Sequence, residues 1–340
     1  MKKITFLIPC FNEEESLPCL FDTLRKFIQG TYKVTLRDDK DGEEKFETEV
    51  DMKAYEWEFL MVNDGSTDGT LDLLRRFRRE DPRVSVLNLS RNFGKENALL
   101  AGMDFARGDA VLIMDADMQH PVETVPEMVA WWERGYDDVY GRRRSRGRES
   151  WVRKRLSLAY YSLLQSTTRI KVLQNVGDFR LLDRRVVRAI CSLRETQRYT
   201  KGLYCWVGFN KKEVEFDQSV RSGGKSSFNL HSLLNLAIDG ITSYTTSPLR
   251  IASVAGLLVS LFAFAYMIFV VVKTLVFGES VQGFPTLLCA ILLLGGLQLM
   301  AIGIIGEYIG RLFNESKGRP PYIVESYNEI RDVTQENNHE

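Results

Sequence analysis

The sequence has few cysteines and no net charge, and each of these shortages narrows the possible functions. The five cysteines are odd in number and never occur in the CxxC spacing of zinc or redox sites. This favours reduced thiols or core packing. Acidic and basic side chains number 45 each, so no overall charge attracts the chain to nucleic acid. We expect no nucleic-acid partner, and any surface that binds an anion must be local.

The N-terminus lacks the long apolar run of a secretory signal peptide. Two lysines precede the apolar residues 4–11, and Glu13, Glu14 and Glu15 follow soon after. This segment is too short for a signal peptide. It predicts a first buried strand instead.

Charged residues are absent from two long segments near the C-terminus. Residues 251–272 and 284–306 each run for about 22 residues without a charge. At about 1.5 Å per residue, each helix would cross a hydrocarbon core about 30 Å thick. We predict two transmembrane helices within residues 247–313, with a pair of helices buried in a soluble core as the alternative.

Small and basic residues around these segments predict packing and orientation. The second span contains several glycines, which would let helices approach closely in lipid and favour a homo-oligomer, with a tetramer as one form; they are Gly295, Gly296, Gly303 and Gly306. Basic residues flank the outer ends of the spans, at Arg250, Arg311, Lys317 and Arg319. The positive-inside rule then predicts a multi-pass protein of the inner (cytoplasmic) membrane. Both termini would be cytoplasmic, with residues 314–340 as a tail.

Residues 1–230 alternate apolar strand-like runs with helical patterns, which is typical of an α/β domain with a largely parallel sheet. Strands are expected at residues 4–9, 57–62, 84–89 and 110–114, and helices at 71–79, 97–106 and 122–134. Such sheets bind ligands at the carboxyl ends of their strands. Residues 33–56 are an irregularity, for which we expect a protruding hairpin, with a disordered insert as the alternative.

Two aspartates follow the apolar run of residues 111–114 directly. Asp115 and Asp117 are two residues apart at a point where the backbone turns, so both carboxylates can face one hard cation. Oxygen ligands with open positions suit Mg²⁺ or Mn²⁺ bridging a diphosphate. The alternative is an aspartate pair that caps a helix or fills a turn.

Turn-forming motifs follow the first and second predicted strands. Residues 63–70 carry Asp64 at the strand tip, where it can accept hydrogen bonds from a nucleotide base or ribose. Residues 9–13 place an aromatic ring and a carboxylate near the same edge. Helix capping by Asp68 or Ser66, and by Asn12, is the alternative for these motifs.

The chain resembles a known family over nearly its whole length. The motifs PCFNEEESL, VNDGSTDGT, SRNFGKENALLAGMDFARGD and MDADMQHP occur in this order and are similar to those of family 2 glycosyltransferases with a GT-A fold. The later NVGDFRLLDRR, RSGGKSSF and GEYIGR motifs narrow the resemblance to the polyisoprenyl-phosphate glycosyltransferases. That group includes dolichyl-phosphate mannose synthase and the bactoprenol glucosyl transferases.

The resemblance implies a GT-A (Rossmann-like) nucleotide-sugar domain, amphipathic helices at the membrane interface and a C-terminal transmembrane hairpin. It implies inverting transfer of one hexose, with UDP-glucose favoured, to polyprenyl (undecaprenyl) phosphate at the cytoplasmic membrane face. GDP-mannose or a UDP-amino-sugar is the alternative donor. A catalytically silent membrane scaffold is the alternative of another class. A processive synthase is disfavoured, because the QxxRW motif is absent.

Residue roles follow from the same resemblance. The residues implied to hold the nucleotide-sugar are Pro9, Phe11, Glu13, Asp64, Arg91, Lys95, Asp115 and Ala116, with Asn92 nearby. Those implied to meet the metal, Mg²⁺ or Mn²⁺, or its diphosphate are Asp115, Asp117 and Gln119. The catalytic set is Asp117 and Asp178, as the resemblance implies, together with Arg142 and Arg155 from the basic run of residues 142–155. Asp178 would lie beside the sugar and the acceptor as a base or a sugar-orienting group, with a helix cap before Phe179 as the alternative.

An anionic lipid head needs cations at the membrane face. Residues 142–170 begin with a run of arginines followed by apolar and aromatic residues, which predicts a juxtamembrane amphipathic region. Residues 226–246 predict a second such helix. The residues expected at the acceptor phosphate are Arg142, Arg155, Arg221, Lys225 and Ser226. Simple attraction to anionic lipid is the alternative, and Ser227 stands where the family more often has a lysine.

Overall fold

The computed structural model describes residues 1–38, 44–144, 176–196, 198–217 and 283–328, with isolated residues between 256 and 276. The chain divides into two compact units. The first unit contains residues 1–165, 170–227 and 320–340, and the second contains residues 166–169 and 228–319. The first unit therefore takes in both ends of the chain.

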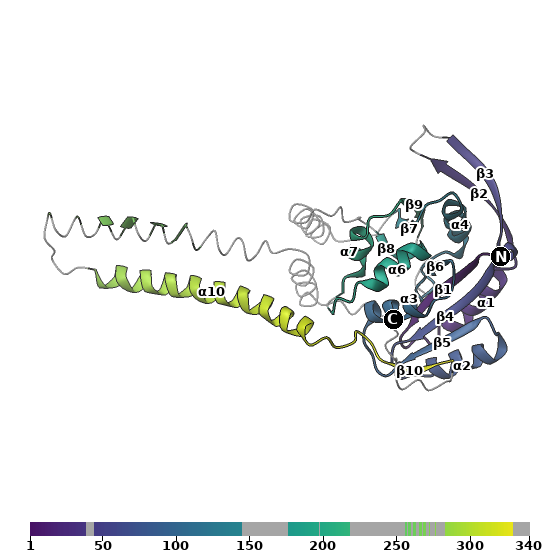
Figure 1. The fold of residues 1–340 in the computed structure, drawn as a ribbon, viewed down its shortest axis with the longest axis horizontal. Coiled ribbons are helices and arrows are strands. Elements are labelled where there is room, and N and C mark those ends of the chain that lie inside the picture. The colour runs from purple at the N-terminus through teal and green to yellow at the C-terminus, as the bar shows by residue number, and fades with distance from the viewer. Residues whose placement is uncertain are drawn as a thin grey trace, which may run out of the picture. The chain divides into compact units, whose positions relative to one another are not determined.

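The first unit is built around an eight-stranded sheet with the order β10-β5-β4-β1-β6-β8-β7-β9 (Figure 1). Its strands are β1 (Lys3–Cys10), β4 (Glu56–Asn63), β5 (Val84–Leu89), β6 (Ala110–Ile113), β7 (Asp138–Arg143), β8 (Val176–Asp183), β9 (Lys211–Phe216) and β10 (Val324–Tyr327). The predicted strands are confirmed as β1, β4, β5 and β6, which pair in parallel. The prediction of a largely parallel sheet was incomplete, because β8 and β10 run antiparallel to their neighbours.

Helices cover both faces of this sheet. One face carries α1 (Leu17–Phe27), α2 (Thr70–Glu80) and α4 (Val125–Glu133). The opposite face carries α3 (Lys95–Phe105), α6 (Arg184–Ser192) and α7 (Thr200–Trp206). The predicted helices at 71–79 and 97–106 are confirmed with small shifts at their ends. The one predicted at 122–134 is a 3-10 turn, η2 (Val122–Thr124), followed by α4, and a similar turn, η1 (Met52–Ala54), precedes β4.

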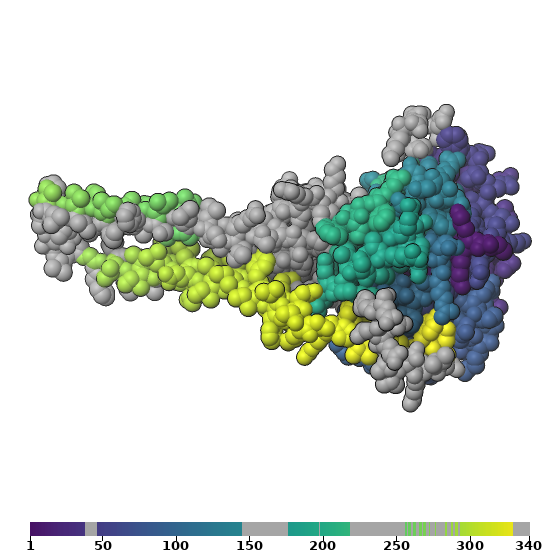
Figure 2. All heavy atoms as spheres, viewed as in Figure 1, coloured from purple at the N-terminus to yellow at the C-terminus, as the bar shows by residue number. Residues whose placement is uncertain are grey.

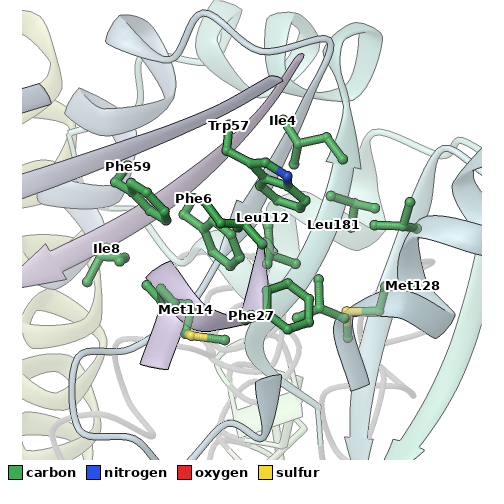
Figure 3. Packing of buried hydrophobic residues seen from close by; sticks show 14 of the residues in the cluster. Ile4, Phe6, Ile8, Phe27, Trp57, Phe59, Leu112, Met114, Met128 and Leu181 are labelled. Atoms are coloured by element: carbon green, nitrogen blue, oxygen red, sulfur yellow. The ribbon is translucent and has the colours of Figure 1, made fainter. Parts of the chain in front are cut away.

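Strand alternation explains why the sheet has two buried faces. In β1, Phe6 and Ile8 belong to one apolar cluster, whereas Leu7 belongs to the other. Phe6 stacks on Trp57 of β4 with ring centroids 5.0 Å apart. Figure 3 shows these rings packed near Leu112 of β6. Burial of each such side chain contributes about 1.5–3 kcal/mol, so the centre of the sheet is a firm base for the loops at its ends.

Helix α3 packs closely on β1 because one of its residues has no side chain. A Cβ atom placed on Gly102 would lie 2.0 Å from a methyl carbon of Leu7, so a larger residue would require the Leu7 side chain or the helix to move. This close approach fixes the position of the first turn of α3, which begins at Lys95.

The insert that was predicted as either a protruding hairpin or a disordered segment is a hairpin. β2 (Thr31–Asp38) and β3 (Glu44–Asp51) form a separate antiparallel pair, which reaches beyond the main sheet in Figure 1. Its side chains Leu36 and Val50 are buried in the main core. Arg134, just after α4, lies over the ring of Phe46 at 4.9 Å. The hairpin is therefore packed against the domain on its inner side.

In the second unit, residues 283–316 contain the helix α10 (Phe284–Ser316). Its residues 293–316 are long and apolar enough to cross a membrane by length and composition. The predicted second span, residues 284–306, lies inside this helix, which continues through the i,i+4 ion pair of Glu307 and Arg311. Most of the predicted first span and all of residues 226–246 lie outside the described residues.

Part of the predicted tail, residues 314–340, joins the main sheet. Val324–Tyr327 form β10, which pairs with β5 at the edge of the eight-stranded sheet. Tyr322 is buried in the same apolar cluster as α3 and donates a hydrogen bond to Asp104 at 2.5 Å. Figure 2 shows part of this C-terminal segment, in yellow, at the surface beside residues coloured blue. The sequence did not predict this strand because it is short and returns from far along the chain.

The predicted amphipathic region at 142–170 begins differently from the prediction. Arg142 and Arg143 are the last residues of β7, and the backbone N–H of Arg144 still donates to Phe216, the last residue of β9. These arginines therefore belong to the sheet and not to an interfacial helix. Residues 145–170 lie outside the described residues.

Candidate active site

The carboxyl ends of β4, β1 and β6 lie side by side in the sheet. The turn after β4 is joined to β1, because the backbone N–H of Asp64 donates to the carbonyl of Cys10 at 2.9 Å. Together with the start of α3 these ends surround a pocket of about 300 Å³. It is lined by Pro9, Cys10, Phe11, Glu13, Asp64, Asn92, Gly94, Lys95, Ala98, Asp115, Ala116 and Asp117.

Most of the predicted donor residues therefore meet in one cavity. Among them, only Arg91 is not in its lining. The guanidinium of Arg91 lies 4.1 Å from the ring centre of Phe93 and donates to the carbonyl of Asn92. Cys10, Gly94 and Ala98 also line the pocket and were not predicted, because small or buried side chains carry no chemical signal in a sequence.

Asp115 and Asp117 both face this pocket, so the two carboxylates share a cavity as the sequence predicted. Asp117 accepts a hydrogen bond from the backbone N–H of Gln119 at 3.1 Å. Met118 between them has a φ of 58°, which turns the chain sharply after β6. Gln119, the third predicted metal ligand, is not part of the pocket lining.

Lys95 connects the aspartate motif to the antiparallel strand β8. Its Nζ lies 2.6 Å from Asp115 Oδ1 and 2.9 Å from Asp178 Oδ2. Burial lowers the pKa of Lys95, but the two carboxylates outweigh burial and the net pKa is raised. The lysine is therefore a fixed cation between two acidic groups.

Asp178 is a residue of β8, so the alternative of a helix cap is wrong. Burial raises the pKa of Asp178, yet Lys95, Lys201 and Arg180 outweigh burial and hold the pKa below its ordinary value. The side chain is buried, and its Oδ1 has no hydrogen-bond partner among the described residues. Asp178 is thus an ionised carboxylate with one oxygen still able to accept a hydrogen bond.

His120 stabilises the turn that begins at Asp115. Its Nδ1 accepts the backbone N–H of Asp115 at 3.2 Å, which assigns the proton of a neutral ring to Nε2. The ring stacks on Phe179 of β8 at 4.7 Å. Burial lowers the pKa of His120, and the charges of Arg143 and Lys95 act in the same direction. A neutral imidazole held in this way fixes the start of the turn.

The loops on the other side of the pocket are held by their own polar side chains. Asp64 accepts the backbone N–H groups of Phe93 and Gly94 at 2.7 and 2.9 Å, one on each oxygen. Each oxygen retains a lone pair for a ligand. Burial raises the pKa of Asp64 despite these hydrogen bonds. The side chain of Phe11 is 45% exposed, and a large exposed ring in a pocket can stack on a nucleotide base.

The capping alternatives have mixed outcomes. Asn12 caps no helix, since α1 has Ser16 at its N-cap position, and the Asn12 side chain accepts from the backbone N–H of Thr67. Asp68 accepts from the backbone N–H of Thr70, the first residue of α2. Asp68 therefore does satisfy a donor at the helix start, whereas Asn12 ties the two loops together.

Two neighbouring arginines at the end of β7, Arg142 and Arg143, have different surroundings. Arg142 of β7 pairs with Glu213 of β9 at 2.8 Å and does not line the pocket. Arg143 points to the opposite face, as alternation requires. Its guanidinium approaches Gly177, next to Asp178, and its charge acts on His120.

The other predicted acceptor residues cannot be placed. Arg155, Arg221, Lys225 and Ser226 all lie outside the described residues.

The carboxylates fit a divalent cation that is shared with a ligand. Among the described residues, no group of three His, Cys, Asp or Glu side chains could hold a metal ion by itself. Mg²⁺ is usually held by one or two carboxylates together with phosphate oxygens and water. Asp115 and Asp117 at the edge of an open pocket supply this donor set.

Comparison with known proteins identifies the family. Residues 5–191 match the family described as Glycosyl transferase family 2, and residues 247–312 match the GtrB C-terminal hairpin. The chain belongs to glycosyltransferase family 2. It is thus a glycosyltransferase, and its mixed α/β sheet is the GT-A fold that the sequence predicted.

Full-length relatives agree with this assignment. The chain is 40% identical to the bactoprenol glucosyl transferase of Shigella phage SfV over 324 residues, covering 95% of this chain and 98% of that protein. It is 39% identical to the prophage bactoprenol glucosyl transferase homolog of Escherichia coli over 322 residues, covering 95% and 98%. An uncharacterized glycosyltransferase of Synechocystis is 41% identical over 322 residues, covering 95% and 94%.

Solved structures are more distant. TarS of S. aureus (residues 1–349) has a TM-score of 0.41 at 17% identity, covering 64% of this chain and 59% of that chain. Glucosyl-3-phosphoglycerate synthase of Mycobacterium tuberculosis, in complex with Mn²⁺ and UDP-glucose, has a TM-score of 0.42 at 18% identity, covering 70% and 76%.

Proposed function

We propose that this glycosyltransferase moves one glucose from UDP-glucose to polyprenyl (undecaprenyl) phosphate, with inversion at the anomeric carbon. The observation that carries the proposal is that Lys95, Asp115 and Asp117 line one pocket and that Lys95 joins Asp115 to the buried Asp178. The names of the relatives, bactoprenol glucosyl transferases, support glucose as the sugar and a polyprenyl phosphate as the acceptor.

The nucleotide would lie at the β1 and β4 ends of the pocket. Pro9 and Phe11 offer apolar surface for the base, and Glu13 and Asp64 offer carboxylate oxygens for the base or ribose. The lysine would act nearer the diphosphate. Lys95 has three N–H donors and uses two of them on carboxylates, so one is left for a phosphate oxygen.

A divalent cation, Mg²⁺ or Mn²⁺, would be held by Asp115 and Asp117. Gln119 is a further candidate, either as a ligand of the cation or as a contact of the diphosphate that the cation binds. When bound, such a cation neutralises charge on the departing nucleoside diphosphate. Ala116, between the two aspartates, is buried and keeps this turn against the core.

The acceptor needs little activation. A phosphate monoester has a second pKa of about 6, so it is largely a dianion near neutral pH. The phosphate oxygen forms the new bond to the anomeric carbon as the bond to the diphosphate breaks, and no proton has to leave a dianionic acceptor. Asp178 would therefore orient a sugar hydroxyl through its Oδ1, which is buried without a hydrogen-bond partner among the described residues, or take a last proton from a monoanionic acceptor.

Cations beside Asp178 would bind the acceptor phosphate. Arg143, which approaches Gly177, takes the role that was predicted for Arg142. Arg155, Arg221, Lys225 and Ser226 remain candidates for the same phosphate, since arginine and lysine can both contact phosphate oxygens.

The chain would work at the cytoplasmic face of the inner membrane. The GtrB hairpin match and the apolar helix α10 support membrane association. We further propose a multi-pass protein with a cytoplasmic catalytic domain and cytoplasmic termini. The exposed glycines of α10, Gly296, Gly303 and Gly306, would support a homo-oligomer such as a tetramer.

The direct test is a donor panel. Purified protein is incubated with undecaprenyl phosphate, Mn²⁺ or Mg²⁺, and UDP-glucose, GDP-mannose or a UDP-amino-sugar, and the mass of the lipid product is measured. A product heavier than the acceptor by one hexose, formed from UDP-glucose and with a β-linkage by NMR, supports the proposal. If only GDP-mannose or only a UDP-amino-sugar gives a product, the proposed donor UDP-glucose is wrong. If no lipid product forms and no nucleoside diphosphate is released, the proposed activity is wrong and the catalytically silent scaffold is favoured.

A further inference from the structure

A chain of hydrogen bonds links the C-terminal strand to the loop after β4. Glu325 Oε2 accepts the side-chain amide N–H of Asn88 at 2.8 Å. Asn88 Oδ1 accepts the side-chain amide N–H of Asn63 at 2.7 Å. Asn63 Oδ1 then accepts the backbone N–H of Ser66 at 3.3 Å. Three strands, β10, β5 and β4, are therefore crossed by one polar connection.

The last residues in this series of hydrogen bonds belong to the loops that line the pocket. The hydroxyl of Ser66 accepts the backbone N–H of Asn12, which follows the pocket residue Phe11. Asn63 directly precedes Asp64, another pocket residue. A change at β10 can therefore reach both loops that line the nucleotide side of the pocket.

Glu325 sets the donor-to-acceptor direction of the three hydrogen bonds that link it to Ser66. A carboxylate can only accept, so Asn88 must present its NH₂ group to Glu325 and its carbonyl oxygen to Asn63. Asn63 must then present its own oxygen to Ser66. Asn88 and Asn63 are 4% and 1% exposed, although Glu325 itself is exposed, so a reversed amide that leaves the buried Asn63–Asn88 link unpaired would be costly.

The backbone of β10 directs Glu325 toward Asn88. The register against β5 shifts between Val324 and Ser326, so Glu325 is the extra residue of a β-bulge. Such bulges re-aim a side chain without ending a strand.

The docking of β10 does not depend on Glu325. Tyr322 donates to Asp104, and the ring of Tyr327 packs against Phe105 at 5.0 Å. Asn328 exchanges two hydrogen bonds with Val86, one through its side chain and one through its backbone. Substitution of Glu325 alone should therefore leave the strand in place.

We propose that Glu325 is a positioning residue for nucleotide binding, acting through Asn88 and Asn63 on the loops that carry Phe11 and Asp64. The proposal rests on the proposed function, in which this side of the pocket binds the nucleotide. It makes the strand after the membrane helix part of the donor site, although no residue of that strand lines the pocket.

The test measures binding of UDP with Mn²⁺ to the full-length chain in nanodiscs by calorimetry. Glu325→Lys puts a hydrogen-bond donor where the Asn88 amide needs an acceptor. The Kd for UDP should therefore rise about five- to tenfold. Glu325→Gln keeps an acceptor oxygen and should stay within about twofold of the parent. Glu47→Lys, the same charge change at an exposed site on β3, is the matched control and should not alter the Kd.

A second substitution should restore the series of hydrogen bonds between residue 325 and Ser66. In the Glu325→Lys background, Asn88→Asp accepts from the introduced ammonium group and from Asn63, so the double variant should return the Kd to within about twofold of the parent. Asn88→Asp alone opposes two carboxylates and should weaken binding. The KM for the lipid acceptor should not change in any of these variants.

The outcomes separate the two proposals. A parent chain that binds no nucleoside diphosphate contradicts the proposed function and the positioning role with it. A parent that binds UDP, with Glu325→Lys binding equally well, overturns the positioning role alone, and so does a double variant that stays as weak as Glu325→Lys. Melting temperatures without nucleotide check the fold, and Glu325→Ala is judged by the same criteria if Glu325→Lys does not fold.

Discussion

At the carboxyl ends of β4, β1 and β6, the functional side chains stand in loops just beyond the strands, whereas on β7 and β8 they belong to the strands themselves. In the first region the position after the strand is sufficient to place Asp64 and Asp115 in the pocket. In the second region the neighbours Arg142 and Arg143 have different partners, since Arg142 pairs with Glu213 and Arg143 approaches Gly177. Loop chemistry can be inferred from order along the chain, while strand chemistry needs the register.

The largest expected effect comes from the loop region. Asp117→Ala should reduce kcat by about a thousandfold or more, because a carboxylate ligand of the catalytic cation is lost. The melting temperature should stay close to that of the parent, since among the described residues the hydrogen bond of the Asp117 side chain is a local one, from the backbone N–H of Gln119. The measurement is release of nucleoside diphosphate in detergent, and equal rates for variant and parent would overturn the metal assignment.

The connection between the two regions should have the next largest effect. Lys95→Met removes the cation between Asp115 and Asp178 and should reduce kcat about a hundredfold. In the parent, the pKa of Asp178 is lowered, so its ionised form is maintained as pH falls well below neutrality. Without Lys95, burial is less opposed and the pKa of Asp178 rises.

The acidic limb of the pH–rate profile should therefore move to higher pH in Lys95→Met, while Lys95→Arg, which keeps the charge, should show a smaller shift. The same sign holds for stability. A carboxyl group with a lowered pKa stabilises the fold above its unfolded pKa of about 3.9, and this contribution is lost as pH falls through the folded value. An unchanged acidic limb in Lys95→Met would show that Lys95 does not control Asp178.

The smallest effect tests the strand region directly. Arg143→Ala should raise the KM for polyprenyl phosphate about tenfold, since a charge-assisted contact with phosphate is lost. Arg142→Ala removes only a half-exposed pair with Glu213 and should change KM less than about twofold. Steady-state kinetics with varied lipid decide between them, and a larger effect at Arg142 would reverse the assignment of faces.

Much of the catalytic fold could be predicted from the sequence because its central strands are apolar runs with clear turn residues at their ends. β5 was predicted at the bounds it has, and β1, β4 and β6 within a residue or so. A hairpin was also expected, at residues 33–56, and its strands lie within residues 31–51. β10 was not, because a short strand with a polar edge has no periodicity of its own and is defined by pairing with distant β5.

The candidate site divides in the same way. Phe11, Asp64, Asp115 and Asp117 were predicted together, and they line one pocket. The bridging contacts of Lys95 could not be predicted, because they depend on the antiparallel β8 lying next to β6. The chain from Glu325 to Ser66 was equally hidden, since its partners are brought together only by the order of the strands.

The central claim is that Asp115 and Asp117 hold a divalent cation against the nucleotide diphosphate. Electron paramagnetic resonance of Mn²⁺ bound to the full-length chain, with and without UDP, tests it most directly. The account predicts Mn²⁺ that binds in the presence of UDP, shows coupling to phosphorus nuclei, and is lost in Asp117→Ala. Equal Mn²⁺ binding in that variant, or bound Mn²⁺ with no phosphorus coupling, would contradict it.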